Sequence, residues 1–320
     1  MLRILLLVAT ALAVNLHSPV ASAQTYPQRT VKFILPFGPA SGTDITARLV
    51  ADRLAARWGK PVVIENRPGG DGLVAINAFV AANDDHTLLW VPVGTFAVHP
   101  YDKDKLPYDA DRDLIPVANV SSLFLAATVS TALNVGSLRE LVELVRANPG
   151  KFNWAAANGN ADFLMSGFLK SNGLEMAKVP YRDILQAPND LAENRIQLLS
   201  SSLAIVTPLM QAGKIKVLAV TDKVRAAPIP EVPTTAEAGL PGLVSIGWFA
   251  MAGPPKMKPE LADFISRAAK EVLKLEDVQA KFRAVGVEPM GGTPAAMAAF
   301  VKEEGERWGE VIKKNNIVLD

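Results

Sequence analysis

The stretch Val31-Lys-Phe-Ile-Leu-Pro-Phe-Gly-Pro-Ala-Ser-Gly-Thr-Asp-Ile-Thr-Ala-Arg48 decides the fold of this chain. It predicts an apolar strand, a loop of small residues and a helix that begins near Thr43. Small residues let the backbone approach a guest closely, and the first N–H groups of a helix lack internal partners at the positive end of its dipole. We therefore expect this loop to bind a carboxylate or a phosphate without a lysine.

The same order of elements recurs farther along the chain. A helix is predicted at 73–82 and a further strand at 87–93. A second loop of small residues, Asn158-Gly-Asn-Ala-Asp162, follows a strand predicted at 152–157 and precedes a helix predicted from Phe163. Alternating strands and helices predict an α/β fold in which each domain is a mostly parallel sheet flanked by helices.

Residues 1–23 have the pattern of a signal peptide. Arg3 supplies the positive start, residues 4–16 are mostly apolar, and Ala21-Ser-Ala23 is a small-x-small cleavage site. The chain contains no cysteine, which excludes a lipoprotein signal, disulfides and thiolate metal sites. We expect export to the periplasm, cleavage before Gln24 and a freely diffusing product.

Charge and motif content exclude several classes of protein. The 33 Lys+Arg and 32 Asp+Glu residues leave a net charge of +1, so no nucleic-acid partner is expected. The histidines, His17, His86 and His99, form no ligand-spaced cluster, and neither G-x-G-x-x-G nor a P-loop occurs. Ser41 stands one place too late for the G-x-S-x-G nucleophile pattern. We expect no enzyme activity, no metal and no cofactor.

The two anion-ready loops suggest a site between two domains. A chain of 320 residues is long enough for two domains, and ligands of open α/β sheets bind at the carboxyl ends of strands. A small acid would then be held from one side by residues 37–44 and from the other by residues 157–162. The candidate ligand-binding residues are Phe37, Gly38, Ala40, Ser41, Gly42, Asp44, Gly94, Thr95, Ala157, Asn158, Gly159, Asn160, Tyr181 and Ser201.

Several polar residues also have a purely structural interpretation. Asp44 either accepts hydrogen bonds from the ligand or only favours the helix N-terminus through its charge. Thr95 either points its hydroxyl into the cleft or belongs to a plain turn. Arg182 either neutralises a carboxylate or is a solvated surface group, and the serines at 200–202 either line the pocket or cap a helix.

Short motifs spread over the whole chain carry a family resemblance. They include Pro36-Phe37 with its small loop, Val62-Val-Ile-Glu-Asn-Arg-Pro-Gly69, Leu106-Pro-Tyr-Asp109, Trp248-Phe249 and Leu319-Asp320. From residue 26 to 320 the chain resembles the extracytoplasmic solute receptors of tripartite tricarboxylate transporters, the Bug or TctC family.

The resemblance implies a two-domain periplasmic-binding-protein fold of type II, a Venus flytrap. We expect domain I at residues 24–122 plus 252–320 and domain II at 123–251. Such a protein catches a small organic acid and presents it to the membrane subunits of the transporter, and we expect it to act as a monomer. The family grips a ligand carboxylate chiefly through backbone N–H groups of the loop that matches 37–44, with further contacts at 94–95 and 157–160.

Departures from the family pattern bear on the ligand. Ser201 stands where aspartate is common, and Asp183 replaces a glycine. Loss of a carboxylate near the distal end of the pocket spares a second ligand carboxylate its repulsion, so we expect a dicarboxylate or an aromatic acid. Two alternatives remain open: a sensor that hands its closed form to a membrane signalling protein, and a periplasmic enzyme that acts on a carboxylic acid.

Overall fold

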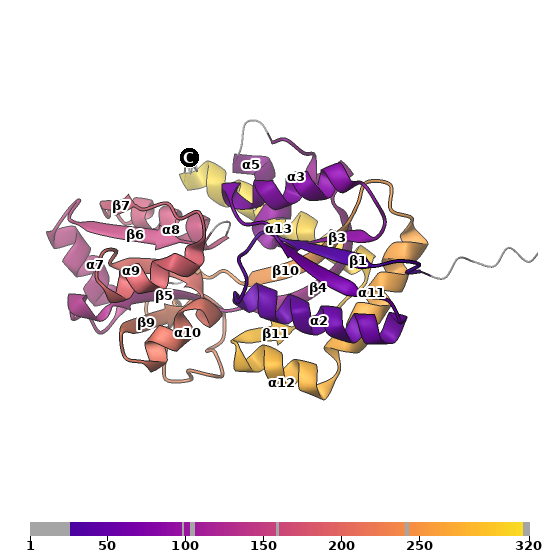
Figure 1. The fold of residues 1–320 in the computed structure, drawn as a ribbon. Helices are drawn as coiled ribbons and strands as arrows, with labels where there is room; N and C mark the ends of the chain where they lie inside the picture. The colour runs from indigo at the N-terminus through magenta and orange to yellow at the C-terminus, as the bar shows by residue number, and fades with distance from the viewer. Residues whose placement is uncertain (1–25, 98, 103–105, 158–159, 241–242, 316–320) are drawn as a thin grey trace, which may run out of the picture.

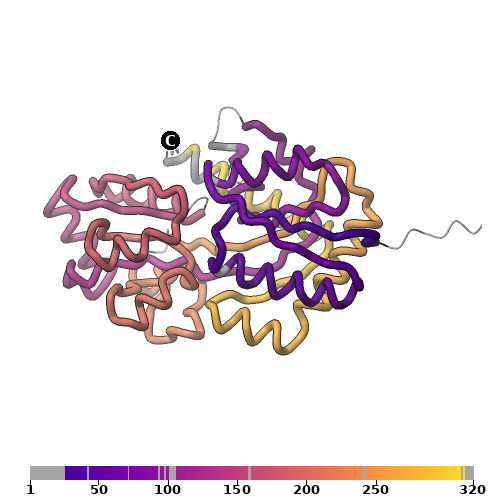
Figure 2. Tube along the Cα trace, viewed as in Figure 1, coloured from indigo at the N-terminus to yellow at the C-terminus, as the bar shows by residue number. Residues whose placement is uncertain are grey.

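The computed structural model describes residues 26–315 except for 98, 103–105, 158–159 and 241–242. These residues form two lobes, each built around its own β-sheet (Figure 1). The larger lobe combines the N-terminal and C-terminal parts of the chain, and the middle of the chain forms the smaller lobe, as the colours of Figure 2 show. The predicted two-domain α/β fold is confirmed.

The sheet of the larger lobe has the strand order β11-β4-β10-β3-β1-β2. Its strands are β1 (Val31–Leu35), β2 (Val62–Asn66), β3 (Thr87–Pro92), β4 (Ile115–Leu123), β10 (Gly247–Gly253) and β11 (Val287–Pro289). The helices of this lobe are η1 (Gly70–Gly72), α2 (Gly42–Trp58), α3 (Leu73–Ala82), α4 (Val93–Ala97), α5 (His99–Asp102), α6 (Ala110–Asp113), α11 (Pro259–Leu273), α12 (Glu276–Ala284) and α13 (Pro294–Asn315).

The sheet of the smaller lobe has the strand order β7-β6-β8-β5-β9. Its strands are β5 (Leu125–Ser130), β6 (Phe152–Ala156), β7 (Met176–Lys178), β8 (Leu198–Ser202) and β9 (Ile215–Val220). The helices of this lobe are η2 (Thr131–Leu133), η3 (Ile184–Gln186), α7 (Leu138–Ala147), α8 (Asn160–Ser171), α9 (Ala187–Ala192) and α10 (Leu203–Gln211).

Both sheets are mixed, whereas the sequence predicted mostly parallel ones. β1 runs parallel to β2 and β3, and β6 runs parallel to β7 and β8. The strands β5 and β10 each follow a crossing from the other lobe, are inserted between two strands of their new sheet, and run antiparallel to both neighbours. Sequence periodicity does not reveal strand direction, so this difference was invisible before the fold was known.

The chain crosses between the lobes twice, and the two crossings lie side by side. Only Phe124 separates β4 from β5, and residues 221–246 connect β9 to β10. Gly247 pairs with Leu123 across the sheet, and the amide of Thr221 donates to the carbonyl of Leu125 at 2.9 Å. We therefore propose that the smaller lobe extends from about residue 124 to about residue 246. The sequence-based limits were 123 and 251, but all of β10, from Gly247 onward, belongs to the sheet of the larger lobe.

The two faces of β1 show why the opening stretch folds as it does. Val31, Phe33 and Leu35 pack in one hydrophobic cluster with residues of α2, and Ile34 packs in another with residues of α3. The helix α2 begins at its N-cap Ser41 and ends at Gly59, whose left-handed backbone lets its amide donate to the carbonyl of Ala55 at 2.9 Å. The strand and helix therefore carry the loop between them to one edge of the sheet.

Several elements differ from the sequence-based expectations. The helical turns α5 and α6, the helix α12 and the strand β11 were not predicted from the sequence. The helix α8 begins at Asn160 and not at Phe163, because the small polar residues of its loop form its first turn. The lobes also touch through α13, where the Trp308 ring lies 5.9 Å from the Phe163 ring of α8.

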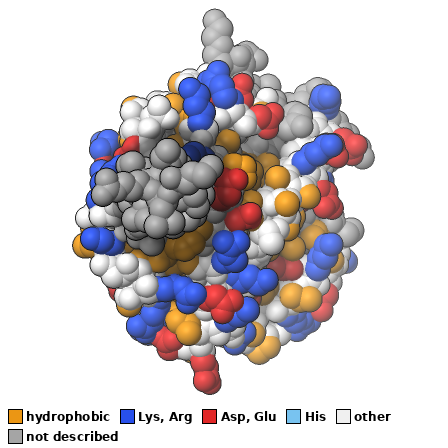
Figure 3. Space-filling view, turned by 90° about the vertical axis from the view of Figure 1, so that its right-hand side faces the viewer, with side chains coloured by type: hydrophobic (Ala, Val, Ile, Leu, Met, Phe, Trp, Pro, Cys, Tyr) orange, Lys and Arg blue, Asp and Glu red, His pale blue; other side chains and the backbone are white. Residues whose placement is uncertain are grey.

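The surface of the larger lobe has no dominant charge on the face shown in Figure 3. Among the described atoms of this face, Lys and Arg side chains are interspersed with Asp and Glu, in keeping with the net charge of +1. Within the described part of the chain, every helix is too short or too polar to serve as a membrane span.

Candidate functional site

A small cavity of about 40 Å³ lies between the lobes, at the carboxyl ends of parallel strands. From the larger lobe it is lined by Phe37, Ser41, Thr43, Pro92, Leu123, Gly247, Trp248 and Phe249. From the smaller lobe it is lined by Leu125, Ala157, Asn160, Ala161, Ser202 and Ile205. The two predicted anion loops, at 37–44 and 157–162, thus contribute to one shared cavity.

The loop before α2 brings Ser41 and Thr43 to the lining of this cavity. Ser41 is 1% exposed, and its hydroxyl accepts a hydrogen bond from the amide of Asp44 at 3.1 Å. The first helical bond runs from the amide of Ile45 to the carbonyl of Ser41, at 2.9 Å. The amides of Gly42 and Thr43 precede this bond and so have no partner within the helix, which leaves two donors at the positive end of the dipole.

Asp44 stabilises this loop through hydrogen bonds. One of its oxygens accepts from the amide of Ala40 at 3.0 Å and from the guanidinium of Arg48 at 2.9 Å, and the other accepts from the amide group of Asn66 at 2.9 Å. Asn66 also donates to the carbonyl of Phe37 at 2.9 Å. Burial opposes the charge of Asp44, but these hydrogen bonds outweigh it and hold the pKa of the carboxyl below its ordinary value.

The loop itself is held in an unusual shape. Ala40 has a φ of 67°, in the left-handed region that favours glycine, and its amide is held by Asp44. Gly38 lies directly beneath a side chain of the other lobe, since a Cβ atom built on it would stand 2.4 Å from the Oδ2 atom of Asp183. The loop is thus braced within its own lobe and touched by the other lobe.

The smaller lobe contributes Asn160, the first residue of α8. Its side chain is 4% exposed and lines the cavity. The amide nitrogen makes only long hydrogen bonds, at 3.5 Å to the hydroxyl of Ser245 and 3.4 Å to the carbonyl of Ile246, and the Oδ1 atom has no partner among the described residues. Buried polar atoms normally have partners, so this side chain is suited to bind a guest or water in the cavity.

Aromatic rings and aliphatic side chains form the rest of the wall. The rings of Phe37 and Phe249 meet edge to face with centroids 5.6 Å apart, and the ring of Trp248 packs against those of Phe96 and Phe300. Sequence reasoning did not single out most of the apolar lining. An apolar residue such as Leu123, Leu125 or Ile205 gives no sign in the sequence of facing a cavity. These side chains line it only because β4, β5 and α10 meet where the chain crosses between the lobes.

The remaining predicted site residues have different positions. Gly38, Ala40, Gly42, Asp44, Gly94, Thr95, Tyr181 and Ser201 are not among the described lining residues, and Asn158 and Gly159 lie outside the described residues. The carbonyl of Thr95 accepts from the hydroxyl of Tyr108 at 2.8 Å. The hydroxyl of Tyr181 donates to Asp190 at 2.6 Å, and burial together with this bond raises its pKa.

Ser201, expected at the distal end of the pocket, is fully buried within the sheet, and its hydroxyl has no partner among the described residues. The neighbouring Ser202 lines the cavity, because consecutive residues of a strand point to opposite faces. The polar serines were therefore a useful signal, but the side chain that reaches the cavity is one position later.

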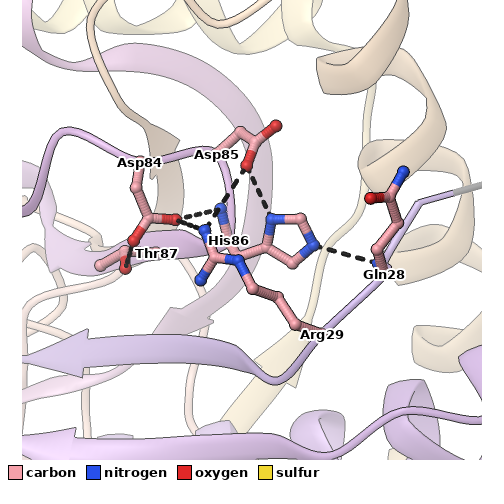
Figure 4. A network of polar contacts seen from close by, with 6 residues as sticks. All are labelled: Gln28, Arg29, Asp84, Asp85, His86 and Thr87. Carbon is pink, nitrogen blue, oxygen red and sulfur yellow. Dashed lines mark hydrogen bonds and ion pairs between the residues drawn. The ribbon is translucent and has the colours of Figure 1, made fainter. Parts of the chain in front are cut away.

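Asp84, Asp85 and His86 form a separate polar cluster at the start of β3 (Figure 4). One ligand-type atom from each lies within 4.8 Å of the others. These atoms have protein partners: Arg29 donates to Asp84 at 2.8 Å, His86 Nδ1 lies 2.6 Å from Asp85, and the amide of Gln28 donates to His86 Nε2 at 3.1 Å. The cluster fastens the segment before β1 to the turn before β3.

Comparisons with known proteins agree on one family. A family model described as the tripartite tricarboxylate transporter family receptor, TctC, matches residues 46–317. The chain is 30% identical to the protein BugT of Bordetella pertussis over an alignment that covers 100% of this chain and 99% of BugT.

Solved structures give the same result at the level of the fold. A structure described as a periplasmic transporter has a TM-score of 0.87 at 32% identity, covering 92% of this chain and 100% of that one. The R. palustris protein Rpa4515, solved with adipate, has a TM-score of 0.86 at 31% identity, covering 92% and 99%. MatC from Rhodopseudomonas palustris, solved with malate, has a TM-score of 0.84 at 26% identity, covering 90% and 100%.

Proposed function

This chain belongs to the tripartite tricarboxylate transporter receptor family, and from that membership we propose that it is a solute-binding protein that captures a small carboxylate between its lobes for such a transporter. Two similar proteins were solved with the dicarboxylates adipate and malate, which supports a carboxylate as the ligand. A dicarboxylate or an aromatic acid is the ligand class that the sequence favours.

The observation that carries the proposal is the meeting of two helix N-termini at one cavity. The helices α2 and α8 come from different lobes, and both begin at residues that line the cavity or adjoin its lining. Their dipoles and first amides favour an anion there. Micromolar affinity needs a binding free energy of about 8 kcal/mol. Hydrogen bonds to charged groups contribute roughly 1.5–3 kcal/mol each, so four or five donors can supply it and offset the entropic cost of ordering the ligand.

The size of the cavity bears on how a ligand enters. Pockets for small molecules usually measure about 300–1,000 Å³, whereas this cavity of about 40 Å³ holds only a few waters. Capture therefore requires the lobes to separate about the two crossings and to close again over the acid. The adjacent crossings at Phe124 and at residues 221–246 are the natural place for this hinge.

Location and partners follow from the same proposal. The signal pattern at residues 1–23 supports export and cleavage, and those residues lie outside the described structure. We assign the mature chain to the periplasm as a monomer that delivers its acid to the membrane subunits of the transporter. Neither a cofactor nor catalysis is part of this proposal.

A thermal-shift and calorimetry panel of mono- and dicarboxylates tests the proposal. The acid that binds should raise the melting temperature, because a ligand that binds only the folded state stabilises it by mass action. Asn160→Asp should lower the affinity for that acid by at least about tenfold, since it adds a negative charge beside the carboxylate. An aspartate in the first turn of α8 favours the helix, so the fold should persist.

Asn189→Asp is the matched control. It makes the same chemical change in the first turn of α9, at an exposed position away from the cavity, and should leave affinity unchanged. If Asn160→Asp and the wild-type protein bound the acid with equal affinity, this cavity would not be the place where the acid binds. Absence of any shift with every acid at millimolar concentration would contradict carboxylate capture itself.

A further inference from the structure

The two helices to which we assign the acid, α2 and α8, each have a buried aspartate in the first turn. Asp44 of α2 is 2% exposed, and Asp162 of α8 is 6% exposed. The helix dipole favours a carboxylate at this position, but the same carboxylate repels an anion bound at the helix end. A helix end of this kind attracts an acid well only if a cation compensates the aspartate.

A cation lies beside each of the two carboxylates. The guanidinium of Arg48 is 2.9 Å from an oxygen of Asp44, and the ammonium of Lys178 is 2.6 Å from an oxygen of Asp162. The first pair lies within one helix, whereas the second joins α8 to β7 (Figure 1). Neither Arg48 nor Lys178 is among the described residues that line the cavity. Both can therefore affect a bound acid without touching it.

Further contacts hold the pair of Lys178 and Asp162 in place. Lys178 of β7 lies opposite Trp154 of β6, and its ammonium is 5.8 Å from the centre of the indole ring. The hydroxyl of Ser166, one turn later in α8, donates to the other carboxylate oxygen of Asp162 at 3.3 Å. Because the carboxylate is shielded from water, its charge acts more strongly on nearby groups than a surface charge does.

Asp162 also lies close to the cavity along the helix. Asn160 and Ala161 precede it and line the cavity, and the carbonyl of Ala161 is fixed by a hydrogen bond from the Ser200 hydroxyl at 3.0 Å. One turn of an α-helix rises about 5.4 Å, so an acid bound at Asn160 would lie roughly 5–10 Å from the carboxylate of Asp162. At such a distance a partly buried, uncompensated charge changes the affinity for an ion by about tenfold.

We infer that Lys178 determines the affinity for the captured acid, acting through Asp162 and not by contact. The inference rests on the proposed function and adds to it a residue outside the cavity. Lys178 cancels the charge of Asp162, so the N-terminus of α8 attracts the acid instead of repelling it. Arg48 has the equivalent place beside Asp44, but Asp44 also holds the amide of Ala40, which ties its charge to the shape of the loop. The pair in the smaller lobe is therefore the one to test.

Three variants of the mature protein, titrated by calorimetry with adipate, malate and benzoate, test the inference. Lys178→Met leaves Asp162 uncompensated and should lower the affinity for each acid that binds, by about tenfold. Asp162→Asn leaves the lysine uncompensated and should raise that affinity, by about threefold to tenfold. The double variant has neither charge and should bind within about twofold of wild type. A lysine with a merely structural role would produce neither the gain nor the recovery.

Two further variants serve as controls. Lys178→Arg keeps the positive charge beside Asp162 and should keep the wild-type affinity. Lys274→Met makes the same chemical change in a lysine that pairs with Glu271 of α11 at 3.1 Å, outside the described lining of the cavity. It should leave the affinity unchanged.

The possible failures can be told apart. Unchanged affinity in Asp162→Asn overturns the inference, even if Lys178→Met does not fold. Equal losses in Lys178→Met and in the double variant overturn it too, because the charge balance would then not be what Lys178 supplies. Carboxylate capture survives both results as long as the wild-type protein binds one of the acids. If the wild-type protein binds none of the three, nor any other acid of the panel, the proposed function and this inference both fail.

Discussion

At the scale of single residues, Ala40 holds a backbone conformation that costs an L-residue roughly 1–2 kcal/mol. Its amide is fixed by Asp44, so the loop keeps this shape despite the cost. We expect Ala40→Gly to raise the free energy of unfolding by about 0.5–1 kcal/mol, because glycine adopts a φ of 67° without strain but loses more freedom on folding. Urea denaturation measures the change.

Ala56→Gly is the matched control for this substitution. Ala56 is exposed in the last turn of α2, where its backbone is still helical, so glycine should instead lower the free energy of unfolding, by up to about 1 kcal/mol. The same substitution is thus expected to have opposite signs at the two positions. A loss of stability at both would show that the left-handed backbone of Ala40 carries no strain.

Asp44 gives a prediction on pH at the same scale. Its pKa is lower in the folded protein than in the unfolded chain, so its stabilising effect is complete above the unfolded pKa of about 4 and is lost as the pH falls through the folded value. Asp44→Asn should therefore cost about 2 kcal/mol of unfolding free energy at pH 7, with a smaller difference from wild type below about pH 4. Denaturant titrations of both proteins from neutral to acidic pH test this. A difference that stays constant down to pH 3 would mean that the ionised form is not what stabilises the loop.

At the scale of elements, α2 and α7 both begin at a capped serine, but only α2 opens at the cavity. The hydroxyl of Ser137 accepts from the amide of Glu140 at 3.2 Å, and the Glu140 carboxylate accepts from the amide of Gly136 at 2.7 Å, in line with the Ser-x-x-Glu pattern. This similarity allows the cap and the site to be separated by experiment.

Ser41→Ala and Ser137→Ala should each lower the free energy of unfolding by about 1 kcal/mol, because each removes a helix cap. Only Ser41→Ala should also lower the affinity for the acid, by about tenfold, because the amides of Gly42 and Thr43 are no longer held in place. Denaturation and calorimetry on both variants make the comparison. Unchanged affinity in Ser41→Ala would show that the N-terminus of α2 does not bind the acid.

At the scale of the whole molecule, Asp183 of the smaller lobe lies over Gly38 of the larger. In Gly38→Ala the added methyl group would stand 2.4 Å from the Asp183 carboxylate in this structure, and we expect the proposed separation of the lobes to relieve that contact. Affinity should therefore fall severalfold, with the free energy of unfolding changed by less than about 0.5 kcal/mol. Calorimetry and denaturation measure the two quantities.

The double variant Gly38→Ala with Asp183→Ala supplies the control. Removing the carboxylate makes room for the methyl group, so the double variant should recover most of the affinity lost by Gly38→Ala. If the affinity does not recover, the methyl group perturbs the loop locally and the contact between lobes is not its cause.

Local pattern was enough to predict many elements and the two loops. The start of α2 and both ends of α3 match the sequence-based expectation within one residue, because caps, breakers and apolar spacing are encoded in neighbouring residues. The same reasoning identified Phe37, Ser41, Ala157 and Asn160, which line the shared cavity. Small residues between a strand and a helix are visible in the sequence wherever they occur.

The aliphatic wall of the cavity, the direction of β5 and β10, and the contact of Asp183 with Gly38 had no such local signature. Each depends on residues far apart in the chain that meet only when the two crossings bring the lobes together. Helix ends and loops follow from short-range hydrogen bonding and backbone preference, so the chain encodes them residue by residue. Which apolar side chains face a ligand instead of a core follows from long-range packing, and so it emerged only when both lobes were in place.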